Sequence, residues 1–409
     1  MFQPNYIINS KILKYISWIE AAKSLIDNAA LIPAWEAQFR TEAEARTVYH
    51  GTHLEGNDLS LTQAKKVIEQ VEEAEGKKKG KVSLKPEKVA DKAGVVGRDR
   101  DIQEIINYRN VLKYIDSLSA SRKKEIPPRL WINQRGINHR LKPAKKPPKV
   151  IIDKNRPELK TYPFYSEKEL LKIHQLTLEK LLPAEKTGKY RTTRVVIKDS
   201  ASGKVTYRPP PPVEVKYQIE EFFEWLNSLS SRDEHAVIRA GIGHFELARI
   251  HPFVDGNGRV ARAFTTLILF REGYDVKRFF SLEEYYDYDP MGYYGALQSV
   301  EKAKGDLTLW LEYFALGLAV ELEKVKEKVK KMSLDSHLRD SYGKQISVSE
   351  RQIKLIEQLK DVGEISVPDA RQVLPMISDD TLLRDFNDLI EKGVVRKIGR
   401  TKGARYVLR

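Results

Sequence analysis

One helix must end and another must begin around twelve consecutive residues, HPFVDGNGRVAR, at positions 251–262. The segments on either side, HFELARI before and ARAFTTLILF after, have helical patterns. The two glycines and the asparagine between them favour left-handed or closely approached backbone. Consecutive backbone N–H groups at the start of the second helix would form an anion site. The stretch therefore predicts a helical domain built around an anion-binding loop.

The charged side chains of this stretch fit phosphate chemistry. Arg259 and Arg262 lie three residues apart on one face of the second helix, where they oppose the helix dipole, so their expected partner is a phosphate. Asp255 offers a hard oxygen for Mg²⁺, which usually accompanies nucleotide phosphates. His251 can accept a proton near neutral pH. A lone histidine is more often a core residue, so this assignment depends on the whole pattern.

Composition excludes several other kinds of site. The 409 residues include no cysteine, which excludes a disulfide scaffold, a thiolate nucleophile and a Cys-ligated metal. With 41% hydrophobic residues, the chain is long enough for two or three domains. Residues 1–8 lack a signal-peptide pattern, and the most apolar later stretch, 307–320, is interrupted by Glu312. We therefore expect a soluble cytoplasmic protein with no membrane partner.

The net charge of +14 is regional. Residues 77–160 hold 24 Lys or Arg and 9 Asp or Glu, a net of +15, so the rest of the chain sums to −1. A basic total therefore does not make this a DNA-binding protein. The lysine-rich stretches are expected to keep the protein soluble, with binding of an acidic partner or nucleic acid as the alternative.

Periodicity divides the chain into four parts. Helical patterns occupy 11–75, 102–115, 166–182, 214–229, 234–250, 257–272 and 306–330. β-rich runs at 190–197 and 205–207 flank turn residues and predict a hairpin. Two lysine-rich stretches, 76–100 and 117–163, indicate a loop or marginal helix and a long irregular segment. The expected domains are an N-terminal helical region with these two insertions, a catalytic core, a linker and a small terminal domain, at 1–163, 164–332, 333–348 and 349–409.

Every fixed position of the pattern H-P-F-x-D-G-N-G-R-x-x-R is present at 251–262, and the chain thereby resembles the Fic family. Gly188-x-Tyr190-Arg191 and Tyr207-x-Pro209-Pro210 resemble the ends of the family's flap segment. Residues 214–227, 293–294 and 307–310 resemble its later helices. The resemblance covers roughly 30–75, 101–116 and 164–330. It implies a mainly α fold, a Fic helical bundle with a β-hairpin flap.

The resemblance also implies an activity, the transfer of AMP from Mg·ATP to a Ser, Thr or Tyr hydroxyl of a target protein or of the chain itself. His251 would deprotonate that hydroxyl, Asp255 would hold Mg²⁺, and the flap would hold the target by strand addition. Arg262 would bind the terminal phosphate, and the other phosphate ligands would be Gly256, Asn257, Gly258 and Arg259. Two alternatives stay open: a DNA-binding regulator whose Fic domain senses nucleotide, and a Fic enzyme that removes AMP or uses another nucleotide.

Residues 52–57, THLEGN, resemble the inhibitory segment Ser/Thr-x-x-x-Glu-Gly/Asn of Fic proteins that carry it N-terminally. Glu55 and Gly56 fit, whereas Gly51 stands where the Ser or Thr is expected. The resemblance implies autoinhibition by Glu55, and a carboxylate there could form a bidentate pair with Arg262. His50 and His53 also suggest a metal site, which we disfavour because no further ligand motif accompanies them.

Residues 349–409 resemble a small α+β winged helix-turn-helix, with helices at 349–359, 367–373 and 378–391 and a wing of 394–398 with 405–408. The third helix would offer Thr381, Arg384 and Asp385 to a DNA groove, with Arg400 and Lys402 in the wing. The segment holds 12 basic and 10 acidic residues, and four aspartates crowd its third helix. Protein contact or homodimer formation is therefore as well supported as DNA binding.

Overall fold

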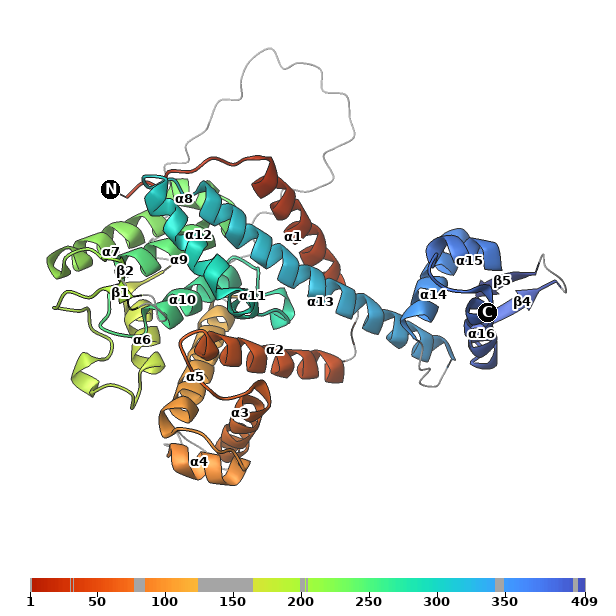
Figure 1. Cartoon of the computed structure of the whole chain (residues 1–409), viewed down its shortest axis with the longest axis horizontal. Coiled ribbons are helices and arrows are strands. Elements are labelled where there is room, and N and C mark those ends of the chain that lie inside the picture. Colours follow the sequence, from red (N-terminus) through yellow and green to blue (C-terminus); the bar gives the residue numbers. More distant parts are fainter. Residues whose placement is uncertain are drawn as a thin grey trace, which may run out of the picture. The chain divides into compact units, whose positions relative to one another are not determined.

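The computed structural model describes residues 2–29, 31, 33–76, 85–123, 165–198, 203, 205–342, 349–399 and 404–408. The chain divides into two compact units, Met1–Ile16 with Glu42–Leu318, and Ser17–Thr41 with Ala319–Arg409. Both are mainly α-helical (Figure 1). Among the described helices, none combines the length and the apolar character that a membrane crossing requires.

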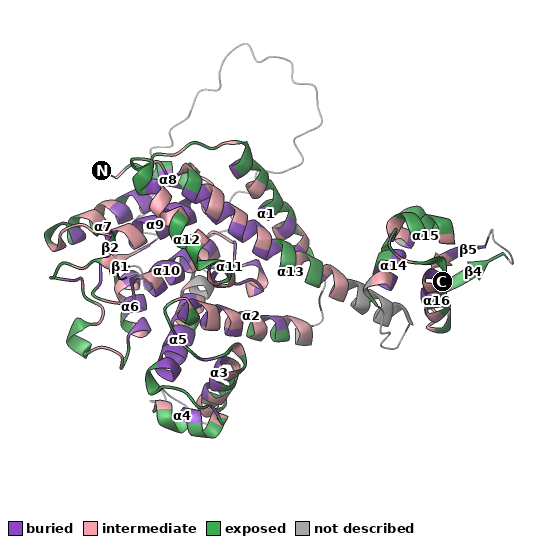
Figure 2. Ribbon diagram, in the orientation of Figure 1, coloured by how far each residue is buried: buried purple, intermediate pink, exposed green. Residues whose placement is uncertain are grey.

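Two buried helices, α9 (Ala236–Ile250) and α10 (Asn257–Arg271), form the centre of the first unit. Most of their residues are buried, as Figure 2 shows, because apolar and small residues predominate in both, and several polar side chains are buried with them. Helix α10 packs against α9, α5 and α6, and α7 packs against α9. The loop at 251–256 is thus held between two core helices.

Of the other helices of the first unit, some pack against this pair, whereas α3 and α4 pack against α5. On the N-terminal side these other helices are α3 (Leu61–Gly76), α4 (Pro86–Ala93), α5 (Asp99–Lys123) and α6 (Glu167–Thr177). After the short η2 (Ala184–Lys186) they are α7 (Pro212–Asn227), α8 (Leu229–Asp233), η3 (Val276–Arg278), α11 (Leu282–Tyr288) and α12 (Pro290–Lys302). Three long helices contribute residues to both units: α1 (Ser10–Asn28), α2 (Pro33–His53) and α13 (Thr308–Tyr342).

The flap hairpin is shorter than the sequence predicts. Strand β1 (Ile197–Lys198) pairs antiparallel with β2 (Val205–Tyr207), and most of the turn between them lies outside the described residues. The predicted strand at 190–197 begins late because Arg191 is used elsewhere. Its backbone N–H donates to the carbonyl of Pro252 at 2.9 Å, so this part of the segment is tied to the central loop.

The C-terminal residues form a three-helix, three-strand domain. Its elements are α14 (Glu350–Val362), β3 (Glu364–Ile365), α15 (Val367–Val373), α16 (Asp379–Glu391), β4 (Val395–Ile398) and β5 (Arg405–Leu408). The antiparallel sheet has the order β3-β5-β4. Phe386 of α16 stacks on Tyr406 of β5 with ring centroids 3.9 Å apart, which joins helix and sheet in one apolar core. The described helices and strands follow one another as the sequence predicts for 349–409, and the two-residue β3 is an addition.

The predicted linker and the first lysine-rich stretch, predicted as a loop or marginal helix, are both partly helical. The expected linker at 333–348 is helical up to Tyr342, and its remaining residues lie outside the described ones. No Gly or Pro occurs between Gly317 and Gly343, and Lys–Glu pairs three residues apart, such as Lys324 with Glu321, support this part of the helix. Within 76–100, residues 86–93 form α4, which ends at Gly94 in the left-handed conformation. The lysine-rich segments 77–84 and 124–163 lie outside the described residues.

Candidate active site

The loop between α9 and α10 is stabilised by an unusual backbone at each end and by one side chain. Helix α9 ends at His251, which is left-handed with φ 50° and ψ 59°. Gly256, with φ 75°, is the N-cap of α10. Between them, the side-chain amide of Asn257 accepts from Phe253 N at 2.8 Å and donates to Phe253 O at 2.9 Å. The loop therefore has its shape before any ligand binds.

This use of Asn257 differs from the prediction that its side chain binds phosphate. Both ends of the amide are engaged by Phe253, and the residue is only 4% exposed. The backbone N–H groups of residues 257–259 lie in the first turn of α10, where they have no partner within the helix. An anion at this helix end would be bound by backbone N–H groups, with Asn257 shaping the loop beneath it.

His251 is arranged to accept a proton. Its Nδ1 lies 3.3 Å from the carbonyl oxygen of Ala248, and this acceptor fixes the proton on Nδ1 and the lone pair on Nε2. Burial lowers the pKa of His251, more than the Ala248 carbonyl and the Glu55 carboxylate raise it. The imidazole is therefore neutral at pH 7, as a general base must be.

Two buried arginines with unsatisfied donors lie on α10. Arg259 and Arg262 are 3% and 2% exposed. Within the described part of the chain, Nε and Nη1 of Arg259 and Nε of Arg262 have no hydrogen-bond partner. Nη1 of Arg259 does lie 3.1 Å from Glu104, an ion pair without hydrogen-bond alignment. Buried donors without acceptors are rare in folded proteins, so these N–H groups indicate the position of an anionic ligand.

Glu55 lies against the second of these arginines. Nη2 of Arg262 donates to Oε1 of Glu55 at 2.7 Å and to the carbonyl oxygen of Gly51 at 2.9 Å. One carboxylate oxygen is used, not the two of a bidentate pair. Burial alone would raise the pKa of Glu55, but Arg262 and Arg259 outweigh it and hold this pKa below its usual value. Glu55 is thus a charged partner of Arg262 at neutral pH.

Steric hindrance explains why position 51 is a glycine. A Cβ built there would lie 2.5 Å from Cε1 of Tyr108, which is 1% exposed and donates its hydroxyl to Glu283 at 3.1 Å. A serine or threonine would collide with this fixed ring. The aromatic ring takes the place of the missing side chain, and the Gly51 carbonyl contacts Arg262. Gly56 follows with φ 90°, a left-handed turn that carries the chain away from α2.

Asp255 is accessible and stands alone as a candidate metal ligand. Its side chain is 46% exposed, and Oδ1 accepts from Gly256 N at 2.6 Å. Within the described residues, no three His, Asp or Glu side chains come together as a metal-binding group. Mg²⁺ is often held by one or two carboxylates together with substrate phosphates, so one carboxylate fits an ion that arrives with a nucleotide.

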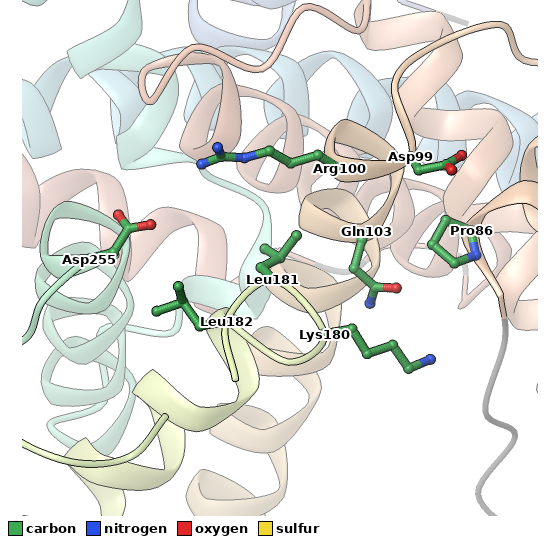
Figure 3. A pocket seen from close by; sticks show the side chains of 8 residues that line it. All are labelled: Pro86, Asp99, Arg100, Gln103, Lys180, Leu181, Leu182 and Asp255. Carbon is green, nitrogen blue, oxygen red and sulfur yellow. The ribbon is translucent and has the colours of Figure 1, made fainter. Parts of the chain in front are cut away.

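A cavity of about 420 Å³ opens beside Asp255 (Figure 3). It extends from Asp255 toward the start of α5, between Leu181 and Leu182 on one side and Arg100 on the other. A bound molecule therefore has room next to the Asp255 carboxylate.

Arg191, predicted only as part of the flap, is tied directly to the loop. Its guanidinium donates to the carbonyl oxygens of His251 at 2.7 Å and Pro210 at 2.6 Å. Because Pro210 follows β2 and His251 ends α9, one side chain joins the base of the flap to the candidate base. The sequence placed Arg191 in a family-like segment, but its partner lies 60 residues away.

His174 of α6 is a loop contact that sequence reasoning missed. Its Nδ1 accepts from Gly188 N at 2.8 Å, its Nε2 lies 3.2 Å from the carbonyl oxygen of Asp255, and its ring stacks on Phe253 at 3.8 Å. Burial lowers the pKa of His174 to about 4, so it is neutral under ordinary conditions. The available signal was a histidine on the apolar face of a helix, which by itself indicates core packing.

His50 and His53 are paired with an aspartate. Their Nδ1 atoms lie 2.7 Å and 2.8 Å from the two carboxylate oxygens of Asp287 on α11. Both histidines belong to the last turn of α2, so these contacts hold the end of that helix just before Glu55. Asp287 thus provides both histidines with a carboxylate partner.

The tail residues proposed for DNA contact are only partly described. Arg384 is exposed and Thr381 is half-buried, whereas Arg400 and Lys402 lie outside the described residues. The expectation that Asp385 faces a groove is wrong, since it is 7% exposed and accepts from Arg351 at 2.8 Å. Asp388 likewise pairs with Lys392, and Asp379 with Arg371. Three of the four aspartates on α16 are therefore paired within this domain.

Comparison with known proteins identifies relatives of the segment that carries this loop. Residues 164–269 match the model of the Fic/DOC family. Protein adenylyltransferase Fic from Nematostella vectensis is 25% identical over 249 residues, which are 60% of this chain and 43% of the relative. Protein adenylyltransferase fic-1 from Caenorhabditis briggsae is 39% identical over 106 residues, 26% of this chain and 19% of the relative. The chain thus spans less than half the length of the relatives it matches.

Solved structures with the same fold cover more of the chain. A Fic family protein from Desulfovibrio desulfuricans matches with a TM-score of 0.56 and 21% identity, covering 100% of this chain and 98% of that one. Fic-1 from C. elegans matches with a TM-score of 0.51 and 22% identity, over 78% of this chain and 74% of that one. At these identities the likeness concerns the fold.

Proposed function

We propose that this chain, whose residues 164–269 match the Fic/DOC family model, is a protein adenylyltransferase. It would transfer AMP from Mg·ATP to a Ser, Thr or Tyr hydroxyl of a target protein or of itself. The observation that carries the proposal is the set of buried, unsatisfied N–H groups of Arg259 and Arg262 beside a neutral His251. Those donors suit phosphate oxygens, and the histidine suits a hydroxyl proton.

In this proposal the chain supplies a base and an anion site. Nε2 of His251 takes the proton of the target hydroxyl as its oxygen forms a bond to the α-phosphorus. The bond from that phosphorus to the bridging oxygen breaks, and pyrophosphate leaves. The backbone N–H groups of 257–259, with Arg259 and Arg262, bind the phosphate oxygens. Asp255 would hold the Mg²⁺ that enters with ATP, and this ion when bound neutralises phosphate charge.

The test uses the variant Glu55→Gly with ATP labelled on either the α- or the γ-phosphate. Protein-bound label is expected from α-labelled ATP and not from γ-labelled ATP, because AMP stays on the target and pyrophosphate leaves. Label from the γ position would indicate a kinase, and no label on the chain or on any lysate protein would contradict AMP transfer. Loss of AMP from a previously modified protein would instead support the AMP-removal alternative.

We propose that Glu55 is an autoinhibitory residue. It occupies one edge of the Arg262 guanidinium that would otherwise bind the terminal phosphate of ATP. A Cβ at Gly258 would collide with the Glu55 carboxylate, so the acid sits directly over the first turn of α10, where the phosphates would bind. Nucleotide and Glu55 would thus compete for the same donors.

AMP transfer is expected to be independent of pH from about pH 8 down to about pH 6.5 and to fall only at lower pH. The unprotonated imidazole is the active form, and burial lowers the pKa of His251 below its usual 6.5. Glu55 raises this pKa, so the Glu55→Gly variant has an even lower one. The measurement is kcat/KM of Glu55→Gly against pH. An acid limb centred above pH 7 would contradict His251 as the base.

A second proposed function is DNA binding by the C-terminal domain. Its support is the internal pairing of Asp379, Asp385 and Asp388, which neutralises most of the acid on α16. Exposed Arg384 on α16 and exposed Arg396 and Lys397 on β4 are left as basic groups for phosphate contact. Protein contact or homodimer formation is the competing use of this domain.

Duplex binding by the full chain is expected to weaken with salt, and each lost phosphate contact reduces the slope of log K against log salt by about 1. Arg384→Ala with Lys397→Ala should weaken binding about tenfold or more. Lys354→Ala is the matched control, because Lys354 is exposed on α14 of the same domain. Fluorescence anisotropy at several salt concentrations measures both effects. Binding that ignores salt, or that all three substitutions affect equally, would favour the protein-contact alternative.

A further inference from the structure

A buried glutamate outside the family motif lies against one of the phosphate-binding arginines. Oε1 of Glu104, on α5, is 3.1 Å from Nη1 of Arg259, and both side chains are almost fully buried, at 4% and 3% exposed. The other carboxylate within ion-pair distance of Arg259 in the described structure, Asp255, is farther at 3.7 Å and is 46% exposed. Glu104 is therefore the principal counter-charge of this buried cation.

The orientation of Glu104 is itself set by a neighbour. Its Oε2 accepts from Nδ2 of Asn57 at 3.1 Å, and the same amide donates to the carbonyl oxygen of Asp101 at 2.9 Å. Asn57 Oδ1 accepts from Leu59 N at 3.1 Å, so this amide is bonded at both ends, and the residue is 2% exposed. With Oε2 held by Asn57, Oε1 accepts from Nε of Arg100 at 3.2 Å and also faces Nη1 of Arg259 at 3.1 Å, so the carboxylate is held between an exposed arginine of its own helix and the buried Arg259.

The geometry of the pair leaves the arginine available for a ligand. The contact from Oε1 to Nη1 is close but not aligned as a hydrogen bond, and Nε and Nη1 have no hydrogen-bond partner among the described residues. The carboxylate thus balances the charge and restrains the guanidinium without using those N–H groups. A neutral partner would leave a buried cation uncompensated and free to turn toward Asp255.

We propose that Glu104 is a positioning residue for AMP transfer, which acts through Arg259 by holding its guanidinium where the nucleotide phosphates bind. This inference rests on the proposed function and adds to it a residue of α5, outside the family-matched segment 164–269. Its effect is on the alignment of a phosphate-binding group, where small displacements have large consequences for rate.

The test is a double-mutant cycle in the Glu55→Gly background, with Glu104→Gln, Arg259→Ala and the two combined. Three quantities are measured for each: the Kd of Mg·ATP by calorimetry, kcat/KM for AMP transfer, and the melting temperature without nucleotide. Glu104→Gln is expected to weaken ATP binding and to lower kcat/KM about tenfold. In the Arg259→Ala background the same change should have no further effect on either, because its target is gone.

A matched control separates positioning from stability. Arg109, also on α5 and fully buried, pairs with Glu75 at 2.8 Å, so Glu75→Gln removes a carboxylate from a buried arginine of the same helix. It should lower the melting temperature while leaving ATP affinity within about twofold. Glu104→Gln should change both.

The possible failures are distinguishable. If Glu55→Gly binds ATP and transfers AMP, but Glu104→Gln behaves like its parent, this inference is overturned and the proposed function stands. Additive effects of Glu104→Gln and Arg259→Ala on ATP affinity would also overturn it, since Glu104 would then act through the fold. If Glu55→Gly neither binds ATP nor transfers AMP, the proposed function falls and the inference falls with it.

Discussion

Replacing His251 by alanine in the Glu55→Gly background is expected to lower the rate of AMP transfer by about 10²–10⁴-fold, the usual contribution of a positioned general base. The neutral imidazole, with its proton held on Nδ1 by Ala248, is the one group of the loop suited to accept the target's proton. ATP affinity should change little, because Arg259 and Arg262 are untouched. Initial rates with α-labelled ATP and the Kd of Mg·ATP measure the two effects.

His235→Ala is a suitable control for the loss of a histidine from this region. His235 precedes α9 and caps it through its side chain, whereas His251 ends the same helix. Losing the cap should cost about 1 kcal/mol of unfolding free energy and leave the transfer rate within a few-fold. If His251→Ala kept more than a tenth of the parent's rate, another proton acceptor would have to be sought.

Replacing Glu55 by glycine is expected to raise the rate of AMP transfer about 10–100-fold above that of the unaltered chain. A charge-assisted hydrogen bond is worth about 1.5–3 kcal/mol, and each 1.4 kcal/mol is a factor of ten in an equilibrium. ATP must displace Glu55 from Arg262, so most of the gain should be seen as tighter binding of Mg·ATP. Calorimetry and initial rates on the two proteins test this.

Glu55→Gln provides the matched comparison for this release. It keeps the size of the side chain and can still accept a hydrogen bond, but it loses the charge that Arg262 and Arg259 stabilise. Its rate should fall between those of the unaltered chain and Glu55→Gly. Equal rates for all three proteins would contradict autoinhibition by this residue.

Much of the candidate site lies in one contiguous stretch, which is why sequence reasoning reached it. The loop between α9 and α10, the histidine at its start and the arginines on one helix face all follow from spacing within 251–262. The supporting contacts do not, because Arg191, His174 and Glu104 come from other segments and meet the loop only in the folded chain. The contacts of the Asn257 amide with Phe253 could not be predicted for a related reason, because an amide's partners depend on the turn it closes.

In the fold as well, local sequence patterns determine some helix and strand bounds, and contacts with distant segments determine others. Helices with a strong amphipathic or apolar pattern, such as α10 and α16, begin and end close to the predicted residues. No helical pattern was predicted over α11 or α12, although residues 293–294 within α12 resemble one of the family's later helices. The predicted strand at 190–197 begins late because the backbone N–H of Arg191 donates to Pro252 O in the distant loop, which no local pattern reports.

Gly258 has a consequence for any genetic selection of overactive forms. A methyl group there would strike the Glu55 carboxylate, which alone would release the enzyme, but it would also stand 3.1 Å from Nη1 of Arg262, inside the space that the phosphates need. The same substitution would therefore remove inhibition by Glu55 and prevent ATP from binding. A screen for hyperactive alleles should recover changes at position 55 and none at 258. The absence of changes at 258 would then support a shared position for Glu55 and the phosphates.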